Sequence, residues 1–172
     1  MIKRLGVLLL AVGLVLVTAS GAAVAAQLRV RDAVNDNMGR GLDIVQASVS
    51  NRDRSVVATV LFREERLGDV VVALRTRHQG TVGLAVKHRS GPDKVLFLTR
   101  KDNGRCAGLR VDWKPKVAAV QFNMPARCLN GGNYGAIKTW ILTEGARGGS
   151  DTDYAPVNDD GNLTYSRWVS RG

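Results

Sequence analysis

The only two cysteines of the chain, Cys106 and Cys128, enclose a segment in which apolar and polar residues alternate in two runs. The first run covers residues 109 to 113, and the second covers residues 118 to 124. Side chains on a strand point to opposite faces in turn, so each run predicts a half-buried strand. Pro115 lies between the runs and indicates a turn, because proline fixes φ and cannot donate to a ladder. The segment therefore predicts a β-hairpin bracketed by the two cysteines.

The first 26 residues have the pattern of a secretory signal peptide. Two basic residues near the start precede an apolar run of 13 residues, and the small residues Ala23-Val24-Ala25 fit a cleavage pattern. The apolar run is too short to span a bilayer comfortably, which weighs against the alternative of an uncleaved membrane anchor. We therefore predict a secreted, extracellular protein without stable membrane insertion after cleavage, in which residues 27–172 form a single domain.

In an exported chain, two cysteines most simply form one disulfide bond, so we predict that Cys106 and Cys128 are joined. The alternative is a pair of free, buried thiols, which an oxidising compartment disfavours. The closed loop of 23 residues would stabilise the fold by about 3 kcal/mol in the chain-entropy model. The second strand of the hairpin must leave its ladder before the bridge, and Pro125 is well placed to end it.

Short strand-like runs separated by turn residues continue through the rest of the mature chain. Besides the two strands of the cysteine hairpin, we expect strands at Leu42 to Ser50, Ser55 to Phe62, Val70 to Arg77, Thr81 to Arg89, Lys94 to Arg100 and Tyr134 to Thr143. One further short strand at 27–40 and one at 163–169 would fit, with irregular chain at 144–162. This spacing of strands and turns predicts an all-β fold, an antiparallel β-sandwich of about eight or nine strands with one disulfide.

The alternation also predicts which side chains are buried. We expect the core to contain Val60, Val72, Leu84, Val111, Val120 and Phe122. Trp113 shares its face with apolar neighbours, which favours packing against the core. Trp140 shares its face with Lys138 and Leu142, and Trp168 is near the end of the chain. For both, packing in the core or at an edge is the preferred interpretation, with an exposed carbohydrate-binding platform as the alternative.

The segment from Val70 to Arg89 predicts a second hairpin. We expect Leu74 to lie opposite Leu84, which leaves a three-residue loop ending at Gly80, where such loops need a positive φ. In this register Asp69 lies opposite Arg89. The apolar residues then share one face of the hairpin, and the opposite face carries four basic residues, Arg75, Arg77, Lys87 and Arg89.

These four basic residues are our predicted ligand-binding residues. One interpretation is a solvated outer face whose charge discourages edge-to-edge pairing. The other is a surface that binds an anionic extracellular polymer, because clustered charge raises the local counter-ion concentration and speeds encounter. The formal net charge of +10, or +8 without Lys3 and Arg4 of the signal peptide, favours anionic partners in general. Acidic cell-envelope polymers, membrane headgroups and acidic polysaccharides all fit.

Residues typical of catalysis are scarce. There is no G-x-S-x-G motif, and the only two histidines, His78 and His88, have no carboxylate beside them in the sequence to orient the ring. Zinc needs clustered cysteines, histidines or carboxylates, which the pattern does not offer. We therefore predict no catalytic residues, no metal and no cofactor, and a protein that is not an enzyme.

The acidic loop from Asp151 to Asp160 is the one segment that suggests calcium. It begins with the pattern D-x-D, but Pro156 stands where an EF-hand needs glycine and Asn162 stands where it needs glutamate. An EF-hand is therefore excluded. A solvated acidic loop is the preferred interpretation, and an irregular calcium loop is the alternative.

Three segments resemble a loose set of small secreted actinobacterial proteins of uncharacterised function. They are GLDIVQASVSNRDRSVVATVLFRE at 41–64, MPARCL at 124–129, and DYAPVNDDGNL at 153–163 followed by Trp168-Val169. The resemblance covers most of the mature domain and implies a β-sandwich of eight or nine strands with one disulfide. It implies no activity and no functional residue.

The function that we predict from the sequence is that of a non-catalytic binding protein of the extracellular space or the cell envelope. An anionic polymer is a candidate ligand, and we expect no nucleic-acid partner. Two alternatives remain: a secreted protease inhibitor that presents a loop braced by the disulfide, and a secreted hydrolase whose site has no recognisable motif.

Overall fold

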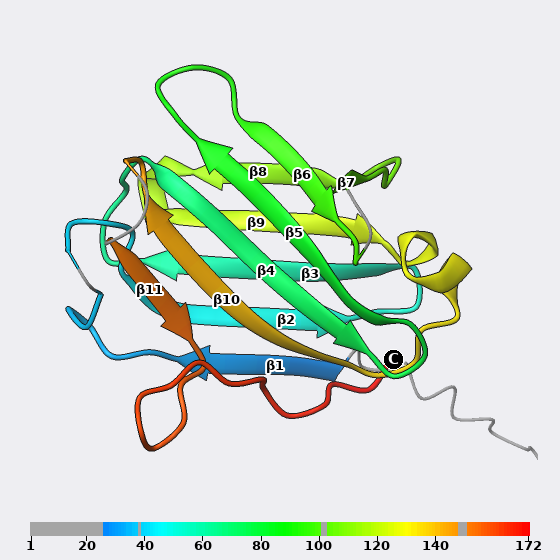
Figure 1. Cartoon of the computed structure of the whole chain (residues 1–172). Helices are drawn as coiled ribbons and strands as arrows, with labels where there is room; N and C mark the ends of the chain where they lie inside the picture. The colour runs from blue at the N-terminus through cyan, green and yellow to red at the C-terminus, as the bar shows by residue number, and fades with distance from the viewer. Residues whose placement is uncertain (1–25, 38, 101–102, 148–150) are drawn as a thin grey trace, which may run out of the picture.

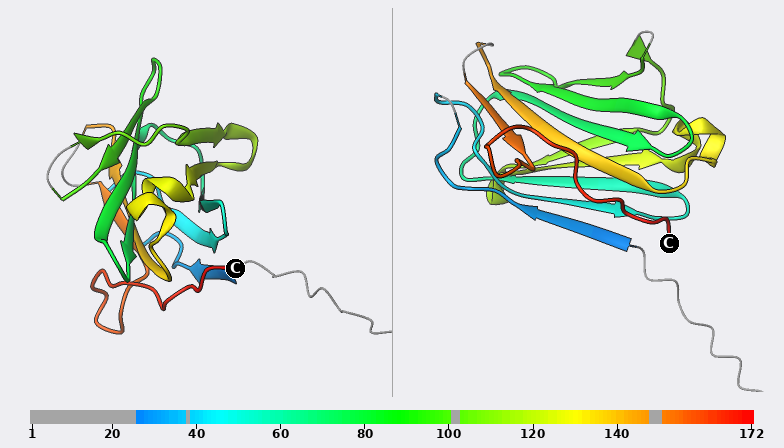
Figure 2. Two further views of the ribbon diagram at one scale, coloured as in Figure 1. Left: turned by 90° about the vertical axis from the view of Figure 1, so that its right-hand side faces the viewer. Right: turned by 60° about the horizontal axis from the view of Figure 1, so that its bottom comes forward.

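The structure, a computed structural model, describes residues 26–37, 39–100, 103–147 and 151–172. The predicted signal peptide lies outside these residues except at its last position. In the described residues, eleven strands form two antiparallel sheets stacked face to face (Figure 1, Figure 2). The predicted all-β sandwich is therefore confirmed. No helix in these ranges has the length and apolar character needed to cross a membrane.

The two sheets contain five and six strands. The five-stranded sheet has the order β1 (Ala26–Arg31), β2 (Ile44–Asn51), β3 (Ser55–Phe62), β9 (Ala119–Pro125) and β8 (Arg110–Lys114). The six-stranded sheet has the order β11 (Thr152–Ala155), β10 (Ile137–Gly145), β4 (Gly68–Thr76), β5 (Gly80–His88), β6 (Lys94–Leu98) and β7 (Asn103–Gly104). In Figure 1 the strands of the six-stranded sheet run diagonally across those of the other sheet. Three short 3₁₀ turns complete the elements found in the described ranges, at Pro115–Val117, Ala126–Cys128 and Asn130–Gly132.

All eight strands that the alternation predicts are present, with ends within three residues of the predicted ones. The first strand, β1, lies largely within residues 27–40, where the sequence suggested one further short strand. Two strands were not predicted: β7, in a stretch with turn residues, and β11, in the stretch expected to be irregular. The strand that fitted at 163–169 is wrong, because that segment makes only isolated bridges at Leu163 and Val169.

The core lies between the sheets and is filled by the inward-facing residues of both. Five of the six predicted core residues are fully buried: Val60, Val72, Leu84, Val120 and Phe122. Val111 is only partly buried. The reason is its place on β8, an edge strand that has a neighbour on one side only.

The register of the β4–β5 hairpin differs from the prediction by two residues. Leu74 lies opposite Val82 and not opposite Leu84, because the loop begins one residue earlier than expected. Gly80 already pairs with Thr76, and its φ of +96° provides the positive value that the loop needs. A shift of two residues keeps every side chain on its predicted face. It does move Asp69, which pairs with Lys87 and not with Arg89.

The predicted disulfide is confirmed, since Cys106 and Cys128 are joined with a Cα–Cα distance of 5.4 Å. Cys106 follows β7 of the six-stranded sheet, and Cys128 ends the 3₁₀ turn that follows β9 of the five-stranded sheet. The bridge therefore connects the two sheets near the edge formed by β7 and β8.

The C-terminal segment, residues 165–172, runs beside the first half of β10 and is joined to it by backbone hydrogen bonds without forming a strand. The backbone N–H groups of Ile137 and Val169 donate to each other's carbonyls at 3.0 and 2.7 Å. The Ser166 N–H donates to the Thr139 carbonyl at 2.8 Å. The buried Asn51 side chain holds this segment in place by donating to the Val169 carbonyl at 3.0 Å.

Candidate functional site

The outer face of the six-stranded sheet carries a groove with a volume of about 540 Å³. One row of the sheet explains its shape, since Trp140, Ala73, Gly83 and Leu98 lie side by side on β10, β4, β5 and β6. In this row the two central strands carry the small residues Ala73 and Gly83, and the flanking strands carry the large residues Trp140 and Leu98. The surface is therefore hollowed over the two central strands. Leu98 packs so closely over Gly83 that a β-carbon there would lie 3.2 Å from it. The floor of the groove is therefore apolar.

One end of the groove is basic. Lys138, Arg75 and Thr81 form the next row on the same face of β10, β4 and β5. Arg75 and Thr81 line the groove, as does Arg100, which follows β6. The Tyr165 hydroxyl lies 3.2 Å from the Thr81 hydroxyl, so this tyrosine of the C-terminal segment reaches across β10 and β4.

Two aromatic rings of the C-terminal segment contact the basic side chains at this end. The Tyr165 ring centre lies 4.7 Å from Lys138 Nζ and 5.8 Å from Arg75 Cζ. The Trp168 ring centre lies 5.2 Å from Lys138 Nζ and 5.3 Å from Arg77 Cζ. Cation–aromatic contacts of this kind fix the positions of the charged groups. Three cations are thereby held together beside the groove.

The four predicted ligand-binding residues are divided between the two ends of the hairpin. Arg75 and Arg77 lie at the basic end of the groove. Lys87 and Arg89 lie at the other end of the β4–β5 hairpin, where Asp69 Oδ2 is 3.3 Å from Lys87 Nζ and Asp69 Oδ1 is 2.5 Å from Arg89 Nη2. The structure therefore brings Arg75 and Arg77 together with Lys138. Asp69 balances part of the charge of Lys87 and Arg89.

His88 has carboxylate neighbours that the sequence did not suggest. Its Nδ1 lies 2.7 Å from Asp93 Oδ1, because the turn after β5 folds back, and its Nε2 lies 3.9 Å from Glu65 Oε1. Its ring contacts Trp113 with a centroid distance of 4.3 Å. Trp113 also contacts Phe62 and packs against the core, as predicted. Within the described ranges, His88 has no hydroxyl or thiol partner that could act as a nucleophile.

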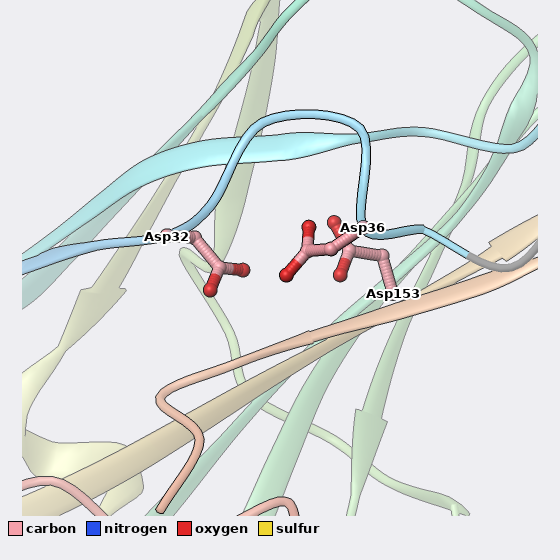
Figure 3. A group of neighbouring side chains, drawn as sticks. All are labelled: Asp32, Asp36 and Asp153. Carbon is pink, nitrogen blue, oxygen red and sulfur yellow. The ribbon is translucent and has the colours of Figure 1, made fainter. Parts of the chain in front are cut away.

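A cluster of three carboxylates lies at the opposite edge of the sandwich, where β1 and β11 meet. Asp32 follows β1, Asp36 lies in the loop between β1 and β2, and Asp153 is on β11. Each contributes one oxygen to a group in which all the oxygens lie within 4.8 Å of one another. Figure 3 shows the three carboxyl groups close together between the loop after β1 and strand β11. We call this group the aspartate cluster.

Asp43, just before β2, is a fourth carboxylate near the aspartate cluster. The residue is 5% exposed, and its Oδ2 accepts the Asn35 N–H at 3.0 Å. Its Oδ1 is buried and, within the described residues, has no hydrogen-bond partner, and the same holds for Asp32 Oδ2. Asp153 is better satisfied, since its Oδ2 accepts the Ile44 N–H at 2.6 Å.

Burial and mutual repulsion raise the pKa of two members of the aspartate cluster. The pKa of Asp32 rises from 3.8 to about 7, first because burial disfavours the charged form and then because Asp153, Asp36 and Asp43 repel it. The pKa of Asp153 rises to about 6, again chiefly through burial, although its backbone hydrogen bonds oppose the shift. The folded protein therefore keeps protons on these groups where a free aspartate has lost them.

This difference predicts a pH dependence of stability. Between about pH 4 and pH 7 the folded state binds more protons at Asp32 and Asp153 than the unfolded state does, so stability falls as the pH rises through this window. We expect the melting temperature, measured with EDTA present, to be lower at pH 8 than at pH 5. Asp32→Asn should flatten the decline, because the amide does not titrate. An unchanged decline in that variant would show that Asp32 is not its source.

Of the acidic loop from Asp151 to Asp160, only Asp153 belongs to the aspartate cluster. The Asp151 side chain accepts the Arg40 N–H at 3.2 Å instead, and the last two aspartates of the loop are exposed. The loop is therefore no local calcium motif. Asp32 and Asp36 could not be predicted as site residues from the sequence, because they lie near the other end of the chain and no spacing pattern joins them to Asp153.

Comparison with known proteins gives no relative: no family model, curated protein or solved structure matches the chain. The resemblance to small secreted actinobacterial proteins stays a prediction.

Proposed function

We propose that this protein is a secreted, non-catalytic binding protein of the extracellular space or cell envelope, and that its groove holds an acidic polysaccharide. The observation that carries the proposal is an apolar groove beside Trp140 that ends at Arg75, with Arg77 and Lys138 next to it. The signal-peptide pattern and the disulfide support secretion, because disulfides persist in oxidising compartments.

A polymer of uronic acids matches both halves of the groove. Each sugar ring has an apolar face that can pack on Trp140 and on the apolar floor. Each carboxylate matches the planar guanidinium groups of Arg75 and Arg100, which bind carboxylates through paired hydrogen bonds. A neutral polysaccharide would use the floor alone, and a polyphosphate would use the arginines alone. An acidic polysaccharide uses the whole site.

The charge of the whole protein supports an anionic ligand. The formal net charge is +10, or +8 without Lys3 and Arg4, and Asp69, which pairs with Lys87 and Arg89, lies at the end of the hairpin far from the basic side chains of the groove. Unbalanced positive charge at the groove steers an anionic polymer towards it and raises the association rate. Binding should therefore weaken as salt rises to physiological strength, because salt screens exposed charges.

The test uses two variants of the same hairpin that remove the same charge. Arg75→Gln with Arg77→Gln alters the groove end, and Lys87→Gln with Arg89→Gln alters the far end. With polygalacturonate as the probe, we expect the first variant to bind at least about tenfold more weakly, since each charged hydrogen bond contributes about 1.5–3 kcal/mol. The second variant should bind about as well as the wild type. Trp140→Ala should also weaken binding.

Titration calorimetry at two salt concentrations measures these affinities, with a neutral dextran as the polymer control. Equal losses in the two paired variants would mean that charge alone attracts the polymer and that the groove is not the site. Equal binding of dextran would remove the role of the arginines. Binding unaffected by Trp140→Ala would remove the role of the groove floor.

A further inference from the structure

We propose that the aspartate cluster is a binding site for a calcium ion, with Asp32, Asp36 and Asp153 as ligands and Asp43 as a fourth carboxylate beside them. The site is separate from the groove and independent of the proposed function. It lies at the edge of the sandwich where β1 of one sheet meets β11 of the other (Figure 3).

The spacing of the oxygens fits one ion. The three ligand oxygens lie within 4.8 Å of one another. Calcium–oxygen bonds are about 2.3–2.6 Å long, so two ligands on opposite sides of the ion are about 4.6–5.2 Å apart. Magnesium usually keeps several water ligands and takes only one or two carboxylates, so a group of three carboxylates with a fourth beside it suits calcium better. The donors are all carboxylates, which suit a hard cation and not zinc or copper.

Unsatisfied buried oxygens are the second observation that points to a cation. Asp43 is 5% exposed, and its Oδ1 has no hydrogen-bond partner within the described residues. Its Oδ2 accepts the N–H of Asn35, which lies in the loop between Asp32 and Asp36, so Asp43 is held beside the cluster. Asp32 Oδ2 is likewise buried without a partner. A buried carboxylate oxygen without a donor is costly, and a bound cation would remove that cost.

No basic side chain in the described residues forms an ion pair with these carboxylates. The three clustered carboxylates and Asp43 lie in a chain whose formal net charge is +8 without Lys3 and Arg4, yet none of the four forms a salt bridge with a described lysine, arginine or histidine. The basic residues of the chain pair elsewhere, for example with Asp69. A divalent cation would provide the missing positive charge.

The position of the site gives the ion a structural role. Asp36 lies in the β1–β2 loop, and Asp153 faces inward on β11. A bound ion would therefore tie this loop to the six-stranded sheet and would join the two sheets at one edge. An ion that binds only the folded protein raises its stability with concentration.

The test is titration of the full mature protein with CaCl₂ after EDTA treatment, by calorimetry and by thermal unfolding. We expect one ion per chain, an affinity on the order of 10⁻⁴ M as in extracellular calcium sites, and a rising melting temperature. Asp36→Asn should weaken binding at least about tenfold. Asp36 is exposed, so the variant should fold without calcium as the wild type does. Asp159→Asn, which removes the same charge from the neighbouring exposed loop, should bind as the wild type does.

Three results would overturn the proposal. The first is the absence of binding heat and of a melting shift up to about 10 mM CaCl₂, well above the range of weak extracellular sites. The second is an equal loss in Asp36→Asn and Asp159→Asn, because only diffuse attraction would then be present. The third is equal affinity for MgCl₂, which would contradict the choice of calcium.

Discussion

Replacing Phe122 with alanine is expected to lower the free energy of unfolding by about 3–5 kcal/mol. Phe122 is fully buried on β9 and lies between Ala58 of β3 and Val111 of β8 in the register of the five-stranded sheet. Removing the ring loses its burial and leaves a cavity that the neighbours cannot fill, because Ala58 is small and its strand is held by ladders on both sides.

Urea unfolding of the wild type and the variant measures this loss. Val117→Ala is the matched control, since Val117 lies just before β9 but is 61% exposed. It should change the free energy of unfolding by less than about 0.5 kcal/mol. A loss below about 1 kcal/mol for Phe122→Ala would mean that the ring does not face the core, and the register of β9 would then be wrong.

The strands could be predicted because each depends on local alternation. The run from Ser55 to Phe62 has the predicted ends, and its residues alternate between buried and partly buried. By contrast, β11 was not predicted. Its inward-facing residues are Asp153 and Ala155, and because one of them is charged, the sequence does not alternate between apolar and polar residues there. The loop of the β4–β5 hairpin was misplaced by one residue, since Gly80 can satisfy the turn as either the last loop residue or the first strand residue.

The candidate sites could be predicted only where one strand or hairpin builds them. Alternation along β4 was enough to place Arg75 on the outer face. Neither the contact of Trp168 with Arg77 nor the ion pairs of Asp69 follow from alternation, because they depend on the path of the C-terminal segment and on the hairpin register. The aspartate cluster depends on the two sheets meeting at an edge, and no local pattern encodes that meeting.

The two edges of the sandwich differ in how the sheets are joined. At the edge of β7 and β8, the covalent bond between Cys106 and Cys128 connects them. At the edge of β1 and β11, Asp153 connects them through its hydrogen bond to the Ile44 N–H, and its repulsion by other carboxylates works against the connection. The connection at the edge of β7 and β8 should therefore be weakened by reductant but not by a change of pH. The connection at the edge of β1 and β11 should be weakened by a rise in pH but not by reductant.

Replacing both cysteines with alanine is expected to lower the free energy of unfolding by about 2–4 kcal/mol. The bridge closes a loop with a sequence separation of 22 residues. In the chain-entropy model this closure removes conformations from the unfolded chain, and the folded state keeps its other contacts. The closed loop contains the whole β8–β9 hairpin. Without the disulfide, the segments that form both strands gain conformational freedom in the unfolded chain.

Urea unfolding distinguishes the bridge from the packing of its sulfur atoms. If the covalent bond is the source of the stability, dithiothreitol should destabilise the wild type by nearly as much as Cys106→Ala with Cys128→Ala does, because both break the same loop closure. The reductant should leave the double variant unchanged, since it has no disulfide. The dependence on urea should also steepen in both reduced and variant protein, because an open unfolded chain exposes more surface. Equal stability of oxidised and reduced wild type would show that the hairpin is held by its ladders alone.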